Sequence, residues 1–179
     1  MTETFSNVEE TRWIRKQAYK FCEASSPQPA RFVTLLSRKG ARRHLVNEEE
    51  IASVLREADY DVQIHNFAEK SFCEQVRIMQ TSKVVISNHG AQLVNLLFLQ
   101  PGSAVIELFN PFFILDMYRE MAKRAEIRYV AIANATIVNL PSEKSRSWWF
   151  HPYAHCDVEM DATVLLHAVQ SLAGSRQLS

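Results

Sequence analysis

Residues 83–98 carry the sequence KVVISNHGAQLVNLLF. Residues 83–86, with Val84, Val85 and Ile86, are typical of a short buried strand, and residues 91–98 are apolar on nearly every side, which predicts a buried helix. The pair His89-Gly90 lies between them. Open α/β sheets bind ligands where a strand passes into a helix, so we expect a phosphorylated ligand at this turn.

A second loop of the same kind is expected about fifty residues earlier. The apolar run RFVTLLS, residues 31–37, predicts a buried strand, and the basic segment RKGARRH, residues 38–44, follows it directly. Guanidinium groups bind phosphate oxygens in a planar fork, which makes Arg38, Arg42 and Arg43 candidates for holding a diphosphate. The alternative interpretation, a solvated basic loop, stays open, and we expect Lys39 and His44 to be solvated.

The remaining sequence alternates between helical and strand patterns. Helical spacing and capping residues predict helices over residues 4–24, from Asn47 (with Glu50), from Ser71 (with Glu74), over residues 114–125 and from Asp161. Strands are expected at residues 31–37, 61–65, 83–86, 103–108 and 127–132, and residues 133–155 are expected to be irregular. This alternation predicts an α/β fold with a doubly wound, parallel, Rossmann-like sheet.

The expected topology also places the loops. Right-handed crossovers bring all strand-to-helix loops to one edge of a parallel sheet, so loops 37–47, 65–71, 87–90 and 108–114 should lie together. We expect residues 1–30 to form an N-terminal helix and linker, and residues 31–179 to form the α/β domain.

Composition excludes several classes of partner. The chain has 179 residues, enough for one domain with a real core. Its 20 basic and 20 acidic residues cancel, so the chain has no global attraction to nucleic acid or to an anionic membrane. No apolar stretch reaches the roughly 20 residues that span a bilayer. The polar N-terminus does not resemble a secretory signal, so the sequence itself gives no localisation.

Candidate site residues cluster around the His-Gly pair. The ring of His89 can donate to a phosphate or ribose oxygen, with a buried core histidine as the alternative. Gly90 lets the backbone approach a ligand closely, and the amides of Gly90 and Ala91 complete the site. Glu107 ends a strand at the same edge, where it can accept from ribose hydroxyls or pair with a nearby arginine.

No metal or cofactor is expected. His151, His155 and Cys156 lack a fourth ligand, and the three cysteines form neither a zinc pattern nor a dense disulfide framework. Phosphate stabilisation is therefore expected from arginines and helix dipoles. Trp148, Trp149 and Phe150 are interpreted as an apolar patch. The absence of GxGxxG and GxxxxGK[ST] argues against a dinucleotide oxidoreductase and a P-loop NTPase.

In their order and spacing, these motifs resemble glycosyltransferase family 61. The resemblance covers roughly residues 31–132. It rests on Ser37-Arg38, Arg42-Arg43, Asn47-Glu48, Ser71-Phe72, Glu74-Gln75-Val76, His89-Gly90-Ala91, Leu93, Asn95, Phe98 and the segment from Pro101 to Leu108.

The resemblance implies the second, nucleotide-sugar-binding half of a GT-B fold. It implies an inverting transfer of a sugar such as GlcNAc or xylose from a UDP-sugar to a hydroxyl of a protein or glycan acceptor, without a metal. Arg38, Arg42 and Arg43 would hold the diphosphate, His89, Gly90 and Ala91 would line the donor pocket, and Glu107 would lie near the ribose. For a full-length eukaryotic relative it implies the ER or Golgi lumen.

Two departures from the family pattern bear on activity. Gln92 stands where many relatives have glycine. The acceptor half, which usually supplies the catalytic base, is not in this chain, so a missing N-terminal domain or an oligomer partner is expected to supply it. The alternatives are a non-catalytic nucleotide-binding module and an unrelated Rossmann-like enzyme such as a methyltransferase.

Overall fold

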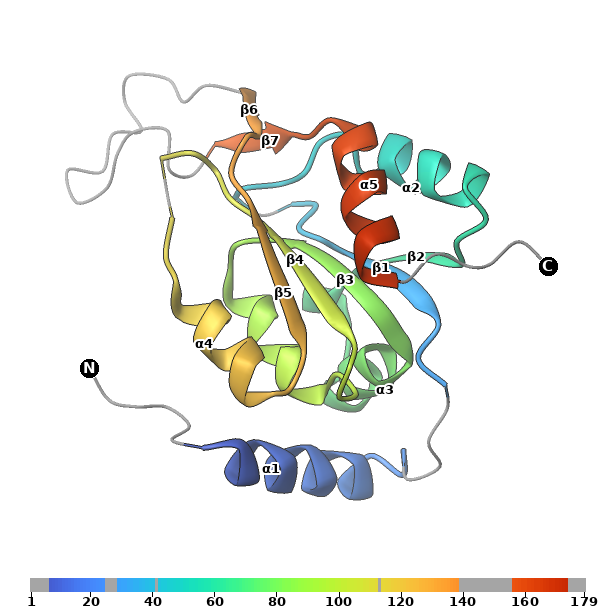
Figure 1. Cartoon of the computed structure of the whole chain (residues 1–179), viewed down its shortest axis with the longest axis vertical. Helices are drawn as coiled ribbons and strands as arrows, with labels where there is room; N and C mark the ends of the chain where they lie inside the picture. Colours follow the sequence, from blue (N-terminus) through green and yellow to red (C-terminus); the bar gives the residue numbers. More distant parts are fainter. Residues whose placement is uncertain (1–6, 25–28, 41, 113, 139–155, 174–179) are drawn as a thin grey trace.

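A parallel β-sheet forms the centre of the molecule (Figure 1). The computed structural model describes residues 7–24, 29–40, 42–112, 114–138 and 156–173. The sheet has the strand order β2-β1-β3-β4-β5, and all its neighbouring strands pair in parallel. The strands are β1 (Phe32–Ser37), β2 (Val62–Asn66), β3 (Ser82–Asn88), β4 (Ala104–Leu108) and β5 (Arg128–Ile132). The expected doubly wound parallel sheet is confirmed.

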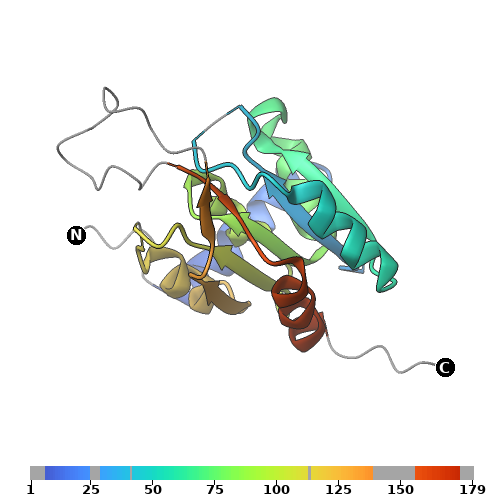
Figure 2. The same cartoon turned by 90° about the horizontal axis from the view of Figure 1, so that it is seen from above.

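The helices cover both faces of the sheet (Figures 1 and 2). The helices of one face are α2 (Glu48–Glu57) and α5 (Ala162–Ala173), whose apolar residues share one core cluster with β1, β3 and β4. The other face carries α1 (Val8–Phe21), α3 (Phe72–Thr81), the 3₁₀ helix η2 (Ala91–Phe98) and α4 (Met117–Arg124). A short 3₁₀ turn, η1 (Phe67–Glu69), follows β2. Both layers bury apolar side chains against the sheet, which gives the fold its main stabilisation.

The strand order places a topological switch between β1 and β3. The chain passes from β1 through α2 to β2 on one side, and then through α3 to β3 on the other side of β1. The loops that follow β1 and β3 therefore diverge to opposite faces and leave a crevice at their carboxyl ends, where such sheets bind ligands. The basic loop follows β1 and the His-Gly pair follows β3, so both predicted motifs lie at this crevice.

Some local expectations are wrong. The range 133–155 was expected to be irregular, but β6 (Thr136–Val138) pairs antiparallel with β7 (Asp157–Glu159). The helix expected from residue 114 begins at Met117. Asn47 does not cap α2: its side chain donates to and accepts from the backbone of Met160, at 2.8 and 3.2 Å, because β7 passes beside the start of α2. Residues 139–155, with Trp148, Trp149 and Phe150, lie outside the described residues.

Other caps are confirmed. Ser71 and Glu74 form a reciprocal capping box at the start of α3. Asp161 Oδ1 accepts from the backbone N–H of Thr163 at 2.8 Å, which caps α5 as expected.

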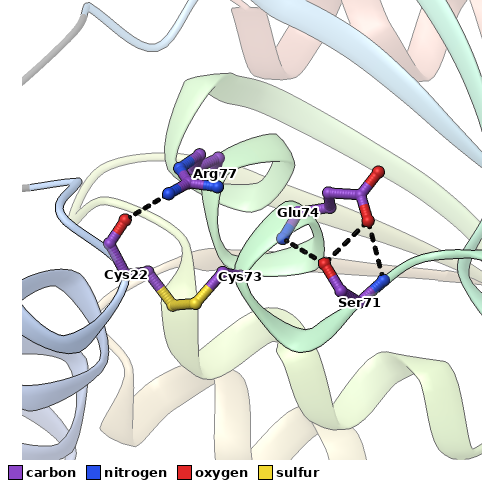
Figure 3. Close-up of a disulfide and its surroundings, with 5 residues drawn as sticks. All are labelled: Cys22, Ser71, Cys73, Glu74 and Arg77. Carbon is purple, nitrogen blue, oxygen red and sulfur yellow. Dashed lines mark hydrogen bonds between the residues drawn. A yellow bond between two sulfur atoms is a disulfide. The ribbon is translucent and has the colours of Figure 1, made fainter.

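A disulfide that the spacing did not predict ties α1 to the domain. Cys22, just after α1, is bonded to Cys73 in the first turn of α3, and Arg77 donates to the Cys22 carbonyl at 2.6 Å (Figure 3). The side chain of Arg15 donates to two backbone carbonyls of the domain, and Tyr19 donates to the Phe98 carbonyl at 2.7 Å. These contacts hold α1 against the η2 layer; the expected boundary at residue 30 stays a prediction.

Candidate functional site

The guanidinium of Arg38 lies against the backbone of Gly90. Arg38 follows β1 directly, and Gly90 follows β3 after one intervening residue. A Cβ atom added to Gly90 would lie 1.7 Å from Nη1 of Arg38, so no other residue fits there without displacing the guanidinium. The φ angle of Gly90 is 165°, which is ordinary extended backbone, so the requirement for glycine here is spatial. The structure thus brings together the basic loop and the His-Gly turn.

A cavity of about 360 Å³ opens beside this contact. Arg38 and Ala91 line it, together with polar side chains that the sequence analysis did not assign to the site. The full lining is Ser37, Arg38, Asn66, Phe67, Ala68, Gln75, Ala91, Gln92 and Asn95. The lining comes from β1, β2, α3 and η2, which confirms that the loops after β1, β2 and β3 share one edge.

Amide side chains fix the walls of this cavity. Gln92 donates to the Leu36 carbonyl at 3.1 Å and to the Ser87 hydroxyl at 2.8 Å, which joins the ends of β1 and β3. Asn95 donates to Gln75 Oε1 at 3.0 Å and so connects η2 to α3. In the sequence, Gln75, Gln92 and Asn95 stood out only in the comparison with the family pattern. Their contacts could not be predicted, because these depend on which strand ends are neighbours.

The basic loop is bonded to the same edge. Nε of Arg38 donates to the Arg42 carbonyl at 3.0 Å, and the Asn88 amide donates to the Arg43 carbonyl at 2.5 Å. The side chain of Arg42 is exposed, whereas those of Arg38 and Arg43 are partly buried. The backbone of Arg43 adopts a φ of 63°, a left-handed conformation that non-glycine residues rarely adopt.

Positive charge is crowded in this loop. Burial lowers the pKa of both Arg38 and Arg43, because desolvation disfavours the charged form. The charges of Arg38 and Arg42 lower the pKa of Arg43 further. An anion bound among these guanidinium groups would relieve this repulsion.

His89 and Glu107 form a buried pair. The His89 side chain is 5% exposed and that of Glu107 is 0% exposed. Nδ1 of His89 lies 2.5 Å from Glu107 Oε1, and the Tyr129 hydroxyl donates to Glu107 Oε2 at 2.6 Å. Protein groups therefore engage both carboxylate oxygens of Glu107, and its expected contact with a ribose stays a prediction.

Two aromatic rings contact the imidazole. Phe109 stacks on the His89 ring at a centroid distance of 5.3 Å, and Tyr118 lies at 5.4 Å and 57°. Burial raises the pKa of Tyr118, and the charge of Glu107 raises it further. The sequence analysis did not assign Tyr118 or Tyr129 to the site. Tyr118 lies in α4 and Tyr129 in β5, and neither belongs to a recognisable motif.

Lys39 and His44, the two other basic residues of the loop, differ in their exposure to solvent. Lys39 is exposed, as expected. His44 is only partly exposed, and its Nε2 lies 3.5 Å from Glu48 Oε2, so its expected solvation is wrong. The cause is the start of α2, which places the Glu48 carboxylate one turn beyond His44.

Metal ligation finds no support in the described residues. Within these ranges, no three or more His, Cys, Asp or Glu side chains are grouped so as to hold an ion. The sequence contains one Asp-x-Asp motif, Asp59-Tyr60-Asp61, but it precedes β2 and so lies at the opposite edge of the sheet. Cys156 is buried, and His151 and His155 lie outside the described residues.

None of the helices in the described ranges combines the length and apolar character that crossing a bilayer requires.

Comparisons with known proteins identify the family to which the chain is similar. Residues 3–106 match the family model of glycosyltransferase 61. The protein O-linked-mannose beta-1,4-N-acetylglucosaminyltransferase 2 of Tetraodon nigroviridis is 29% identical over 142 residues, which cover 76% of this chain and 24% of the relative. The EGF domain-specific O-linked N-acetylglucosamine transferase of Drosophila melanogaster is 34% identical over 107 residues, which cover 58% of this chain and 20% of the relative.

The five-stranded parallel sheet with helices on both faces (Figure 1) defines a Rossmann-like α/β domain. More narrowly, the chain belongs to glycosyltransferase family 61, because the family model matches more than half of its length. It spans about a quarter of the length of the curated relatives that it matches.

Proposed function

We propose that this chain binds the nucleoside diphosphate of a UDP-sugar and forms the donor half of an inverting, GT-B type glycosyltransferase. The observation that carries this proposal is the contact between Arg38 and Gly90, where a Cβ would lie 1.7 Å from the guanidinium. That contact places a cation at the start of η2 and beside a cavity, at the switch point where doubly wound sheets bind phosphorylated ligands.

In this proposal the chain's residues act by charge stabilisation. Arg38 and Arg43, with Arg42 at the rim, bind the diphosphate, and the backbone amides of Gly90 and Ala91 face the same group. As the sugar is transferred, negative charge grows on the departing nucleoside diphosphate, and fixed guanidinium groups stabilise that charge without a metal. His89 borders the diphosphate from the β3 side.

The acceptor and the base belong to the rest of the proposed enzyme. Relatives of this chain are named as transferases of N-acetylglucosamine to O-linked mannose and to EGF domains. We propose a protein or glycan hydroxyl as the acceptor, and a base from a further domain or an oligomer partner that removes its proton. No residue of this chain is assigned as the catalytic base.

The disulfide supports a proposal about compartment. Disulfides form and persist in oxidising surroundings such as the ER lumen and are rare in the cytosol. Cys22 and Cys73 are bonded, so we propose that the chain works in the ER or Golgi lumen.

Calorimetric titration with UDP tests the proposed function. Arg38→Ala should weaken UDP binding by about 1.5–3 kcal/mol, the value of a hydrogen bond to a charged group, or roughly 10- to 150-fold in Kd. The matched control is Lys39→Ala, which removes the same charge from an exposed neighbour and should leave the Kd within about twofold. Equal affinities in the wild type and Arg38→Ala would refute the assignment.

A further inference from the structure

The carboxylate of Glu107 is buried between two donors that come from different elements. Its side chain is 0% exposed, and it meets the His89 ring after β3 and the Tyr129 hydroxyl on β5. A buried carboxylate is costly unless its oxygens are hydrogen-bonded, and both oxygens of Glu107 are. One of these donors is the ring of His89, which the proposed function places beside the ligand, so the arrangement bears on ligand binding as well as on packing.

The chemistry of the pair specifies where the protons lie. An ionised carboxylate only accepts hydrogen bonds, so the nitrogen that faces it must carry a proton. Burial and the contact with Glu107 both raise the pKa of Tyr129, so its hydroxyl stays protonated and donates. An ionised Glu107 therefore receives one hydrogen bond at each oxygen, and Nδ1 of His89, 2.5 Å from Oε1, is the donor that this arrangement requires.

The ring is also fixed in orientation. Phe109 stacks on it with an interplanar angle of 23°, and Tyr118 contacts it at an angle of 57°. The contact at Nδ1 and the two aromatic rings together restrict rotation of the imidazole and fix the plane of its ring.

We propose that Glu107 and Tyr129 are positioning residues that hold His89 in one orientation with Nδ1 donating to Glu107, so that the carboxylate stabilises a second proton on Nε2 from which the ring donates to the diphosphate. The statement about the Nδ1 proton rests on the geometry of the free protein. The statement about the diphosphate rests on the proposed function. This separation allows the two to fail independently.

The proton position is tested in the absence of ligand. Long-range ¹H–¹⁵N spectra of histidine distinguish a protonated from an unprotonated ring nitrogen, and His89→Ala assigns the signals. The wild type should show Nδ1 protonated near neutral pH. In Glu107→Gln, Tyr129 continues to donate to the amide oxygen and the amide N–H turns toward the ring, so the proton should move to Nε2. An unprotonated Nδ1 in the wild type, or an unchanged spectrum in Glu107→Gln, overturns the proposal.

A double-mutant cycle with UDP tests whether Glu107 acts through His89. Glu107→Gln should raise the Kd of UDP about tenfold in the wild type, and by less than about twofold when His89 is already alanine. An equal loss in both backgrounds would show that Glu107 does not act through His89, which overturns the positioning role. If UDP fails to bind the wild type, the proposed function falls, and the proton position still decides the first part.

Tyr129→Phe is the second variant, in case Glu107→Gln does not fold. It removes one donor to Glu107 from strand β5 and should raise the Kd of UDP about threefold while leaving Nδ1 protonated, because the carboxylate remains. Tyr19→Phe is the matched control: it removes a hydroxyl bonded to the Phe98 carbonyl at 2.7 Å, far from His89 along the chain, and should leave the Kd unchanged. Equal effects of the two tyrosine variants would contradict the proposal.

Discussion

Gly90 is required because Arg38 occupies the space that any side chain would take. A Cβ at this position would lie 1.7 Å from Nη1 of Arg38. The guanidinium is the end of a flexible side chain, so it can move away at little cost in folding. The consequence of a substitution should therefore appear in ligand binding more than in stability.

Gly90→Ala should raise the Kd of UDP about tenfold, as expected for a displaced charge-assisted hydrogen bond, and should lower the free energy of unfolding by less than about 1 kcal/mol. Titration calorimetry and urea unfolding measure the two effects. In an Arg38→Ala background the same substitution should have no further effect on the Kd. An undiminished effect in that background would show that Gly90 acts independently of Arg38.

Sequence reasoning recovered part of the site at this scale. The proximity of the loops that carry Arg38 and Gly90 was predicted, because a strand-to-helix junction with arginine or His-Gly is a recognisable pattern; the binding roles of Arg38, His89 and Gly90 stay predictions. The positioning role proposed for Glu107 could not be predicted, because its two hydrogen-bond partners lie after β3 and on β5. Tyr129 was missed, and Gln92 was noted only as a departure from the family pattern, because a tyrosine or a glutamine has no chemical signature until its neighbours are known.

At the scale of elements, the attachment of α1 depends on one covalent bond and a few polar contacts. Cys22 and Cys73 are separated by 51 residues, so their bond restricts a long loop of the unfolded chain. Wide spacing carries no pairing signal in sequence, which is why this bond was not predicted.

Replacing both Cys22 and Cys73 with serine should lower the free energy of unfolding by about 2–4 kcal/mol, since the chain-entropy estimate for such a loop is roughly 4 kcal/mol. Urea unfolding monitored by circular dichroism measures this change. Cys156→Ser, which replaces the free buried thiol, is the control: its free energy of unfolding should fall on addition of a reducing agent by as much as that of the wild type. A wild type equally stable with and without reductant would contradict the role of the bond.

Alkaline pH should loosen α1 through Tyr19. Burial raises the pKa of its hydroxyl to about 12, above the unfolded value near 10. A raised pKa means that the neutral hydroxyl contributes fully below pH 10 and that this contribution is lost as the pH rises through about 12. Urea midpoints at pH 9 and 11 should fall more steeply for the wild type than for Tyr19→Phe. Parallel curves for the two proteins would count against this account.

At the scale of the molecule, ligand binding should be measurable as added stability. UDP at about 100 times its Kd stabilises a folded protein by roughly 2.7 kcal/mol. For a domain of this size that corresponds to a rise in Tm of roughly 5–10 °C. S-adenosylmethionine should give no shift, which separates the proposed function from a methyltransferase. A shift with S-adenosylmethionine and none with UDP would reverse the assignment.

The sequence alone determined the alternation of strands and helices, the parallel doubly wound sheet and the resemblance to the family. These follow from local periodicity, capping residues and short motifs, which depend on neighbours within a few turns of chain. The tertiary structure alone decided the Cys22–Cys73 bond, the partners of Glu107 and the passage of β7 beside Asn47. Each of these joins residues that are far apart in the chain, and the strand order and the packing of the layers determine which of them meet.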